Sequence, residues 1–162
     1  MPLHTDFAAR CALTVWAAIA ALSPVAATVA QTPDAATSAA LDEGIASAHR
    51  SEANKARDRY RHPKETLEFF GLQRDMTVVE IWPGGGWYTE ILAPLLKGTG
   101  TLYAAQYSGS TSFGYQREEM NALRAKIERW PEIFGDVKLT ALGFPDELEI
   151  APPGSADLVV TF

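Results

Sequence analysis

The sequence predicts an α/β fold built around a doubly wound parallel β-sheet. Beyond residue 76, short apolar runs alternate with segments of helical period, and a glycine-rich turn follows the first run. Strands that alternate with helices pair in parallel, because each connection crosses back over the sheet. The predicted strands cover residues 76–82, 101–107, 137–142 and 156–162, with helices at residues 87–96 and 115–130.

Each of these elements has its own local signal. The first apolar run centres on Val78 and Val79, and β-branched residues favour strands. In the longer helix, Met120, Leu123 and Ile127 recur at helical spacing and predict a buried stripe. The connection before the last strand contains three prolines and is expected to be mostly loop.

A helical region is expected ahead of the sheet. Residues 41–60 are rich in alanine and charge, with a potential break near Arg50, where Ser51 is a candidate start for a second helix. Pro63 suits the first turn of another short helix. Gly71 is placed to end that helix.

Residues 1–30 have the pattern of a secretory signal peptide. Arg10 precedes an uncharged apolar run, and small residues suited to cleavage follow it. The run is short for a bilayer span, so we favour cleavage over an anchor and expect no membrane span afterwards. The sequence therefore predicts an exported protein, periplasmic or secreted. Residues 31–40 are expected to form a linker, and residues 41–162 the N-terminal part of the folded domain.

Composition argues against several classes of protein. The chain is 47% hydrophobic and 21% charged, which is typical of neither disordered nor fibrous proteins. Its net charge of −6 disfavours nucleic acid as a partner. The one cysteine, Cys11, lies in the predicted signal, so no disulfide or thiolate metal site is expected in the exported part. The three histidines are dispersed, and no metal site is expected from them either.

The glycine turn is the most informative stretch of the sequence. Gly84, Gly85 and Gly86 follow the first predicted strand and precede a predicted helix. Glycines let backbone N–H groups approach a ligand, and a helix N-terminus adds partial positive charge. In open α/β sheets the ligand lies beyond the carboxyl ends of the strands, which is where this turn falls. Glu80, inside the strand, is placed to accept hydrogen bonds from the turn.

An acid inside the strand followed by glycines resembles motif I of the class I S-adenosylmethionine-dependent methyltransferases. Around it, residues 57–63 and the run Trp-Pro-Gly-Gly-Gly-Trp-Tyr at residues 82–88 resemble a family of exported bacterial methyltransferases, over roughly residues 50–162. This resemblance implies S-adenosylmethionine as cofactor and an unidentified methyl acceptor. The residues it implies for cofactor binding are Glu80, Gly84, Gly85, Gly86, Gln106 and Tyr88.

Three positions depart from the commoner methyltransferase pattern. Trp82 stands where the first glycine of motif I is usual. Gln106 ends the second strand, where the superfamily usually has an acid for the ribose hydroxyls, and an amide carbonyl lacks charge assistance. After the third strand the nearest acid is Asp146, so the sequence identifies no group that recognises adenine.

The resemblance implies seven strands in the order 3-2-1-4-5-7-6, of which this chain supplies four. We therefore expect an N-terminal fragment of a longer protein, with both helices of the sheet region on one face and a bare apolar second face. Acceptor-side groups usually follow the fourth strand, so no catalytic residue is identified. Two other interpretations remain: a non-catalytic exported binding module, and a nicotinamide oxidoreductase, which Thr89 at the third glycine position disfavours.

Overall fold

The computed structural model describes residues 32–162, and the predicted signal peptide at residues 1–30, with Cys11, lies outside this range. Helices and strands alternate in the second half, as the sequence predicts. In chain order the elements are α1 (Ala35–Ala46), α2 (Glu52–Lys55), α3 (Asp58–Arg61), α4 (Pro63–Phe69), β1 (Thr77–Ile81), α5 (Thr89–Leu96), β2 (Thr101–Tyr107), α6 (Gly114–Arg129), α7 (Pro131–Phe134), β3 (Lys138–Leu142) and β4 (Leu158–Thr161).

The four strands form one sheet in the order β3-β2-β1-β4, and every pair is parallel. Val79 at the centre of β1 pairs with Tyr103 of β2 and with Val159 of β4. The prediction of a parallel α/β sheet is confirmed, and this strand order is that of a Rossmann-like fold. The order reverses between β1 and β4, which is the point where ligands bind in such sheets.

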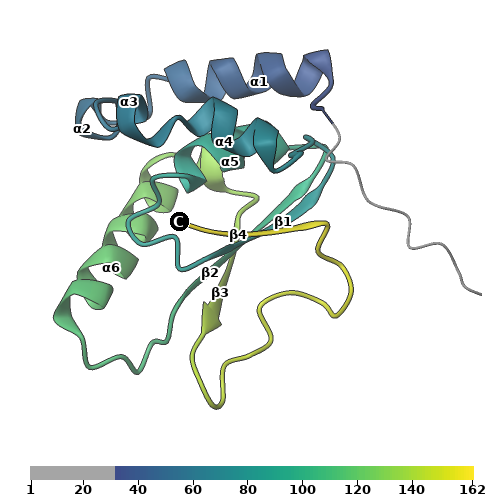
Figure 1. Ribbon diagram of the computed structural model, residues 1–162. Coiled ribbons are helices and arrows are strands. Elements are labelled where there is room, and N and C mark those ends of the chain that lie inside the picture. Colours follow the sequence, from purple (N-terminus) through teal and green to yellow (C-terminus); the bar gives the residue numbers. More distant parts are fainter. Residues whose placement is uncertain (1–31) are drawn as a thin grey trace, which may run out of the picture.

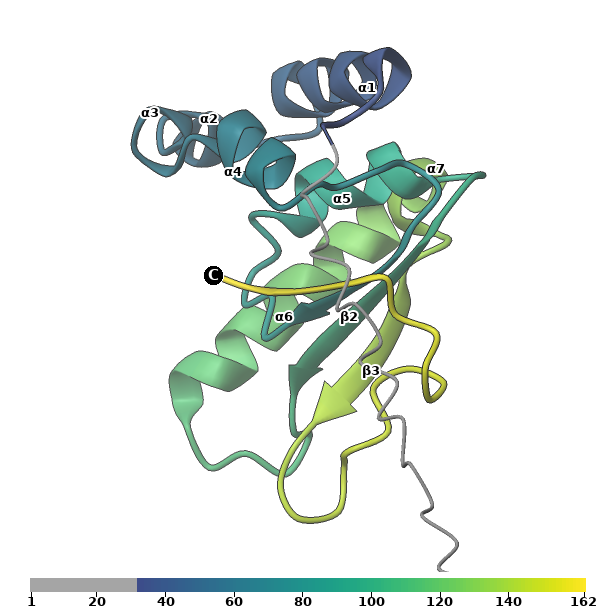
Figure 2. The same ribbon diagram turned by 45° about the vertical axis from the view of Figure 1, so that its right-hand side comes forward.

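The helices of the described region gather on one side of the sheet (Figures 1 and 2). Val78 of β1 and Leu102 of β2 belong to the same buried cluster as Ile91 and Leu92 of α5, and Ile127 of α6 packs against this cluster. Both crossover helices therefore cover the face that carries Val78, as right-handed connections in one direction require. Helix α1 lies outside α5 as a further layer, and its Leu41 is fully buried.

The second face of the sheet carries no helix among residues 32–162, yet its centre is not bare. Val79 and Ala105, which point to this face, are 1% and 0% exposed. The connection from β3 to β4, residues 143–157, covers part of it, and the Thr140 hydroxyl donates to the Ile150 carbonyl at 3.0 Å. The expectation of a bare apolar face is therefore wrong at the centre, although Val159 of the edge strand β4 remains 54% exposed.

The N-terminal helices begin earlier than the sequence suggests. Residues 35–40 belong to α1, so the predicted linker at residues 31–40 is wrong over these positions. The Asp34 carboxylate caps this helix by accepting from the Thr37 backbone N–H, and Thr37 is buried. Small side chains at residues 35–40 let α1 pack closely. Composition alone does not distinguish such a helix from a linker, because small residues are typical of both.

Other boundaries follow from local chemistry. Ser51 caps α2, and Gly71 adopts a φ of 71° just beyond α4, both as the sequence predicts. Helix α5 begins at Thr89, two residues later than expected, because residues 84–88 form turns. The short helix α7 was not predicted.

Among the residues that the structure describes, no helix is both long enough and apolar enough to cross a bilayer.

Candidate ligand-binding cleft

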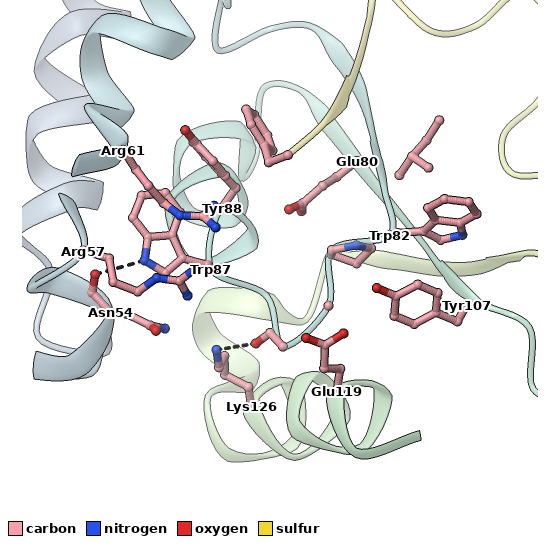
Figure 3. A pocket seen from close by; sticks show the side chains of 15 residues that line it. Asn54, Arg57, Arg61, Glu80, Trp82, Trp87, Tyr88, Tyr107, Glu119 and Lys126 are labelled. Carbon is pink, nitrogen blue, oxygen red and sulfur yellow. Dashed lines mark hydrogen bonds between the residues drawn. The ribbon is translucent and has the colours of Figure 1, made fainter. Parts of the chain in front are cut away.

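A cleft of about 360 Å³ opens at the carboxyl ends of β1 and β4, where the strand order reverses (Figure 3). This volume is within the range of small-molecule sites. We call it the switch-point cleft. Residues from the glycine turn, the first two strands, the N-terminal helices, α6 and the end of β4 line it, namely Asn54, Arg57, Arg61, Glu80, Ile81, Trp82, Pro83, Gly84, Gly85, Trp87, Tyr88, Tyr107, Glu119, Lys126 and Phe162.

The glycine turn is shaped by its packing against α6. Gly84 and Gly86 have φ angles of 57° and 82°, which side-chain-bearing residues rarely adopt. A Cβ on Gly86 would lie 2.7 Å from Leu123 Cδ1, and one on Gly84 would lie 3.2 Å from the Glu119 carboxylate. The two glycines therefore give the chain its sharp turn and allow α6 to approach. Gly86 is not part of the cleft lining.

Two side chains hold the carbonyl oxygens of the turn. The Gln106 amide donates to the Gly84 carbonyl at 2.8 Å, and the Lys126 ammonium donates to the Gly85 carbonyl at 2.6 Å. The backbone N–H groups of Gly84 and Gly85 donate to no partner within residues 32–162. Both residues line the cleft, so their N–H groups are available to an anionic or carbonyl oxygen of a ligand.

Gln106 holds the glycine turn from the end of β2. Its side chain is 6% exposed and lies behind the turn, where its amide oxygen accepts from the Tyr107 N–H while its nitrogen holds Gly84. It does not line the switch-point cleft. Both ends of the amide are engaged within the protein, and the expectation that Gln106 receives ribose hydroxyls from a cofactor stays a prediction.

Glu80 lines the cleft from inside β1, but its partner is not the glycine turn. Its carboxylate accepts from the Thr89 hydroxyl at 2.7 Å, at the start of α5. The expected hydrogen bonds from the N–H groups of residues 84–86 are not formed. Burial raises the pKa of Glu80 to about 7, and the Thr89 hydrogen bond and the Lys126 charge only partly oppose this. Glu80 thus ties β1 to α5 beneath the turn.

Tyr88 lies where the predicted site requires, on the cleft wall. It is 3% exposed and stacks on Phe162, the residue after β4, with ring centroids 3.4 Å apart. Burial raises its pKa above the ordinary tyrosine value. Tyr88 therefore joins the helix end of the turn to the end of β4, closing the cleft on that side.

An aromatic and acidic wall faces the turn from the other side. Trp82, with a φ of 50°, stacks on Tyr107 with ring centroids 5.9 Å apart, and its indole is 49% exposed. Glu119 of α6 approaches Gly84, and Figure 3 shows its carboxylate near Tyr107. Burial, followed by the neighbouring Glu119 charge, raises the pKa of Tyr107. This wall combines a flat aromatic surface with a carboxylate.

A buried ionic network supports the opposite, cationic wall. Glu90 of α5 is 1% exposed and accepts from the Asn54 amide at 2.9 and 3.0 Å. The Lys126 ammonium lies 2.6 Å from the same carboxylate, and the Arg50 Nε atom lies 3.6 Å away. Arg50 is also fully buried and pairs through both terminal nitrogens with Asp58. The network therefore joins the N-terminal helices, α5 and α6 behind the turn.

Sequence reasoning located the turn, Glu80 and Tyr88, and it missed the groups that α6 contributes. Glu119 and Lys126 lie seven residues apart, which places them on one face of the helix. The apolar stripe through Leu123 runs between them. Polar residues at both ends of a buried stripe were the available signal, but nothing local indicated that this face meets the turn.

The cleft offers a ligand three kinds of contact. Gly84 and Gly85 offer free N–H groups, and the aromatic pair offers a flat surface. Glu119, in place of Gln106, supplies a carboxylate that accepts from hydroxyl groups.

No family model, no curated protein and no solved structure matches the chain.

Proposed function

We propose that the switch-point cleft binds S-adenosylmethionine and that this chain is an exported methyltransferase-like protein whose acceptor is unknown. The observation that carries the proposal is the position of the turn: Gly84 and Gly85 line a cleft at the reversal of strand order, with their N–H groups free. In parallel α/β sheets this position is the usual ligand site. The resemblance of residues 57–90 to exported methyltransferases supports the same ligand.

The proposal assigns a different part of the cofactor to each wall. The N–H groups of Gly84 and Gly85 would bind the amino-acid portion, and the Glu119 carboxylate would accept from the ribose hydroxyls. The stacked pair of Trp82 and Tyr107 would lie against the flat base. When bound, S-adenosylmethionine supplies an electrophilic methyl group, and the protein's part is to orient it and exclude water. We assign no catalytic residue.

A non-catalytic binding module is the second candidate. Gln106 and Glu80 are both occupied by hydrogen bonds within the protein, to the turn and to Thr89. Polar groups that only hold the turn and the start of α5 in place favour a fold retained for binding without methyl transfer. Such a module would keep the cleft and use it for a different small molecule.

Isothermal titration calorimetry of the purified chain separates these proposals. We expect S-adenosylmethionine and its demethylated product, S-adenosylhomocysteine, to bind with dissociation constants well below 1 mM, a range typical of cofactor sites. NADH serves as the control ligand and should give no heat. The absence of binding at millimolar S-adenosylmethionine, with a folded protein, contradicts the methyltransferase proposal and favours the module.

A further inference from the structure

Two arginines on the cationic wall of the cleft have no carboxylate partner in the part of the chain that the structure describes. Arg57 and Arg61 both line the switch-point cleft, and within residues 32–162 neither guanidinium forms an ion pair. Figure 3 shows both side chains reaching past the indole of Trp87 towards the cleft. Their Cζ atoms lie 5.9 and 4.9 Å from the centroid of that ring.

The charge of this pair is left uncompensated by the local sequence. The only acid among residues 57–61 is Asp58, and both of its carboxylate oxygens accept from Arg50, at 2.7 and 2.8 Å. Arg50 is fully buried, so the pairing with Asp58 balances an internal charge. Asp58 therefore turns inward, and it does not compensate the charges of Arg57 and Arg61.

The acids of the cleft lie elsewhere. Glu80 is bonded to Thr89 inside β1, and Glu119 stands beside Gly84 on the aromatic wall. The Lys126 ammonium is itself paired with the buried Glu90. The cleft consequently has one cationic end and one acidic end, and the two guanidinium groups at the cationic end form no ion pair among the described residues.

Both arginines lie over the indole of Trp87, which separates them from the core. Trp87 is 6% exposed, and its N–H donates to the Asn54 carbonyl at 2.9 Å. A guanidinium held against an aromatic ring keeps its planar donors free for a second partner and loses less entropy on binding. Two such groups, four residues apart in the chain, line the same cleft and offer planar donors of the kind that bind carboxylate or phosphate oxygens.

We infer that Arg57 and Arg61 form an anion-binding site in the switch-point cleft, which takes a carboxylate or phosphate group of the bound molecule. The inference deepens the proposed function, because it states that the cleft selects anionic ligands. The anion is either the carboxylate of the amino-acid portion of S-adenosylmethionine or an anionic group on a second ligand. Both sources present the same oxygen acceptors to the two guanidinium groups.

The test compares the wild type with the double variant Arg57→Gln/Arg61→Gln and with Arg59→Gln. Arg59 belongs to the same charge run but lies over the exposed Tyr60 and outside the cleft, so its variant is the matched control. The probes are S-adenosylhomocysteine, inorganic phosphate, and methylthioadenosine, which is a nucleoside without an anionic group. Calorimetry gives each affinity, and thermal melting checks that each variant is folded.

We expect the double variant to bind at least one anionic probe about 10-fold or more weakly, the effect of losing a charge-assisted hydrogen bond. Arg59→Gln should bind that probe like the wild type. Methylthioadenosine should bind all three proteins equally, which also shows that the cleft is intact. A loss confined to S-adenosylhomocysteine identifies the anion as the ligand's own carboxylate, and a loss confined to phosphate identifies a second ligand.

Three results would overturn the inference. In the first, the double variant binds every anionic probe as the wild type does. In the second, the wild type binds no anionic probe. In the third, Arg59→Gln weakens binding as much as the double variant does, so that only general charge matters. Failure of the proposed function looks different: the wild type would bind phosphate through Arg57 and Arg61 but would bind neither nucleoside.

Discussion

The side-chain nitrogen of Gln106 lies 2.8 Å from the carbonyl oxygen of Gly84 and joins the end of β2 to the glycine turn from behind. Gly84 lines the cleft, and its N–H donates to no partner among residues 32–162. The resemblance implies that Gln106 contacts the ligand. In the structure its amide instead positions the backbone of the glycine turn, which we propose contacts the ligand.

Substitution of Gln106 by glutamate distinguishes these two roles. Gln106→Glu replaces the donor with a second oxygen facing the Gly84 carbonyl, so we expect a loss of about 2 kcal/mol in the free energy of unfolding. Binding of S-adenosylhomocysteine should weaken as well, because the turn is no longer held. Urea unfolding and calorimetry measure the two effects. Tighter binding with unchanged stability would instead show that residue 106 contacts ribose.

The glycine turn predicts a contrast between neighbouring substitutions. Gly86→Ala should cost about 2 kcal/mol or more in the free energy of unfolding, since the residue has a φ of 82° and its new Cβ would meet Leu123. Gly85→Ala is the control, because its nearest contact would be Ala122 Cβ at 3.9 Å. Urea unfolding of both variants is the measurement. Equal effects would show that packing on α6 does not set the requirement.

The buried ionic network predicts a large effect from one acid. Glu90→Ala removes the partner of Lys126 and Asn54 and leaves cations without compensation in the interior, which should cost about 3 kcal/mol or more. The matched control is Glu52→Ala, an exposed acid in a surface pair with Lys55, whose loss should leave the unfolding midpoint unchanged. Chemical denaturation checks both. A Glu90 variant as stable as the control would refute the role of the network.

Glu80 predicts a pH dependence of stability. Its folded-state pKa of about 7 lies above the ordinary value of 4.5, so between these values the folded protein holds a proton that the unfolded chain has lost. The contribution of Glu80 to the free energy of unfolding therefore falls as pH rises from about 4.5 to 7. This loss of stability is complete above pH 7. Its size is at most on the order of 3 kcal/mol.

Glu80→Gln should remove this dependence while its amide oxygen still accepts from Thr89. We expect the variant to match the wild type near pH 4.5 and to exceed it in stability at pH 8. Urea unfolding across this range is the measurement, with the exposed Glu118→Gln as control. A variant that keeps the wild-type slope between pH 4.5 and 7 would contradict the assignment to Glu80.

Local sequence signals were sufficient for the parallel sheet and most of its helices. Residues 101–107 were predicted as a strand and are β2, because an apolar run between two glycine-containing turns has few alternatives. The expected helix at residues 115–130 is α6 within one residue at each end. The turn at residues 84–86 was also located correctly, since three glycines after a strand point to few structures.

The rest depended on contacts distant in the sequence. Helix α1 was missed over residues 35–40. Its Thr37 is buried by tertiary packing, and a run of small residues gives no local sign of such packing. Gln106 could not be assigned its role, because that role requires the Gly84 carbonyl 22 residues away. Glu119 was overlooked for the same reason: its place beside the turn follows only from how α6 crosses it.

The affinity of Glu119→Gln for S-adenosylhomocysteine tests the central claim most directly. Glu119 is the cleft carboxylate proposed to receive the ribose hydroxyls, and Glu118 next to it is exposed and outside the cleft. By calorimetry, we predict that Glu119→Gln binds about 10-fold more weakly than the wild type and that Glu118→Gln binds equally. Undiminished binding by Glu119→Gln, or no binding by the folded wild type at millimolar ligand, would contradict the account.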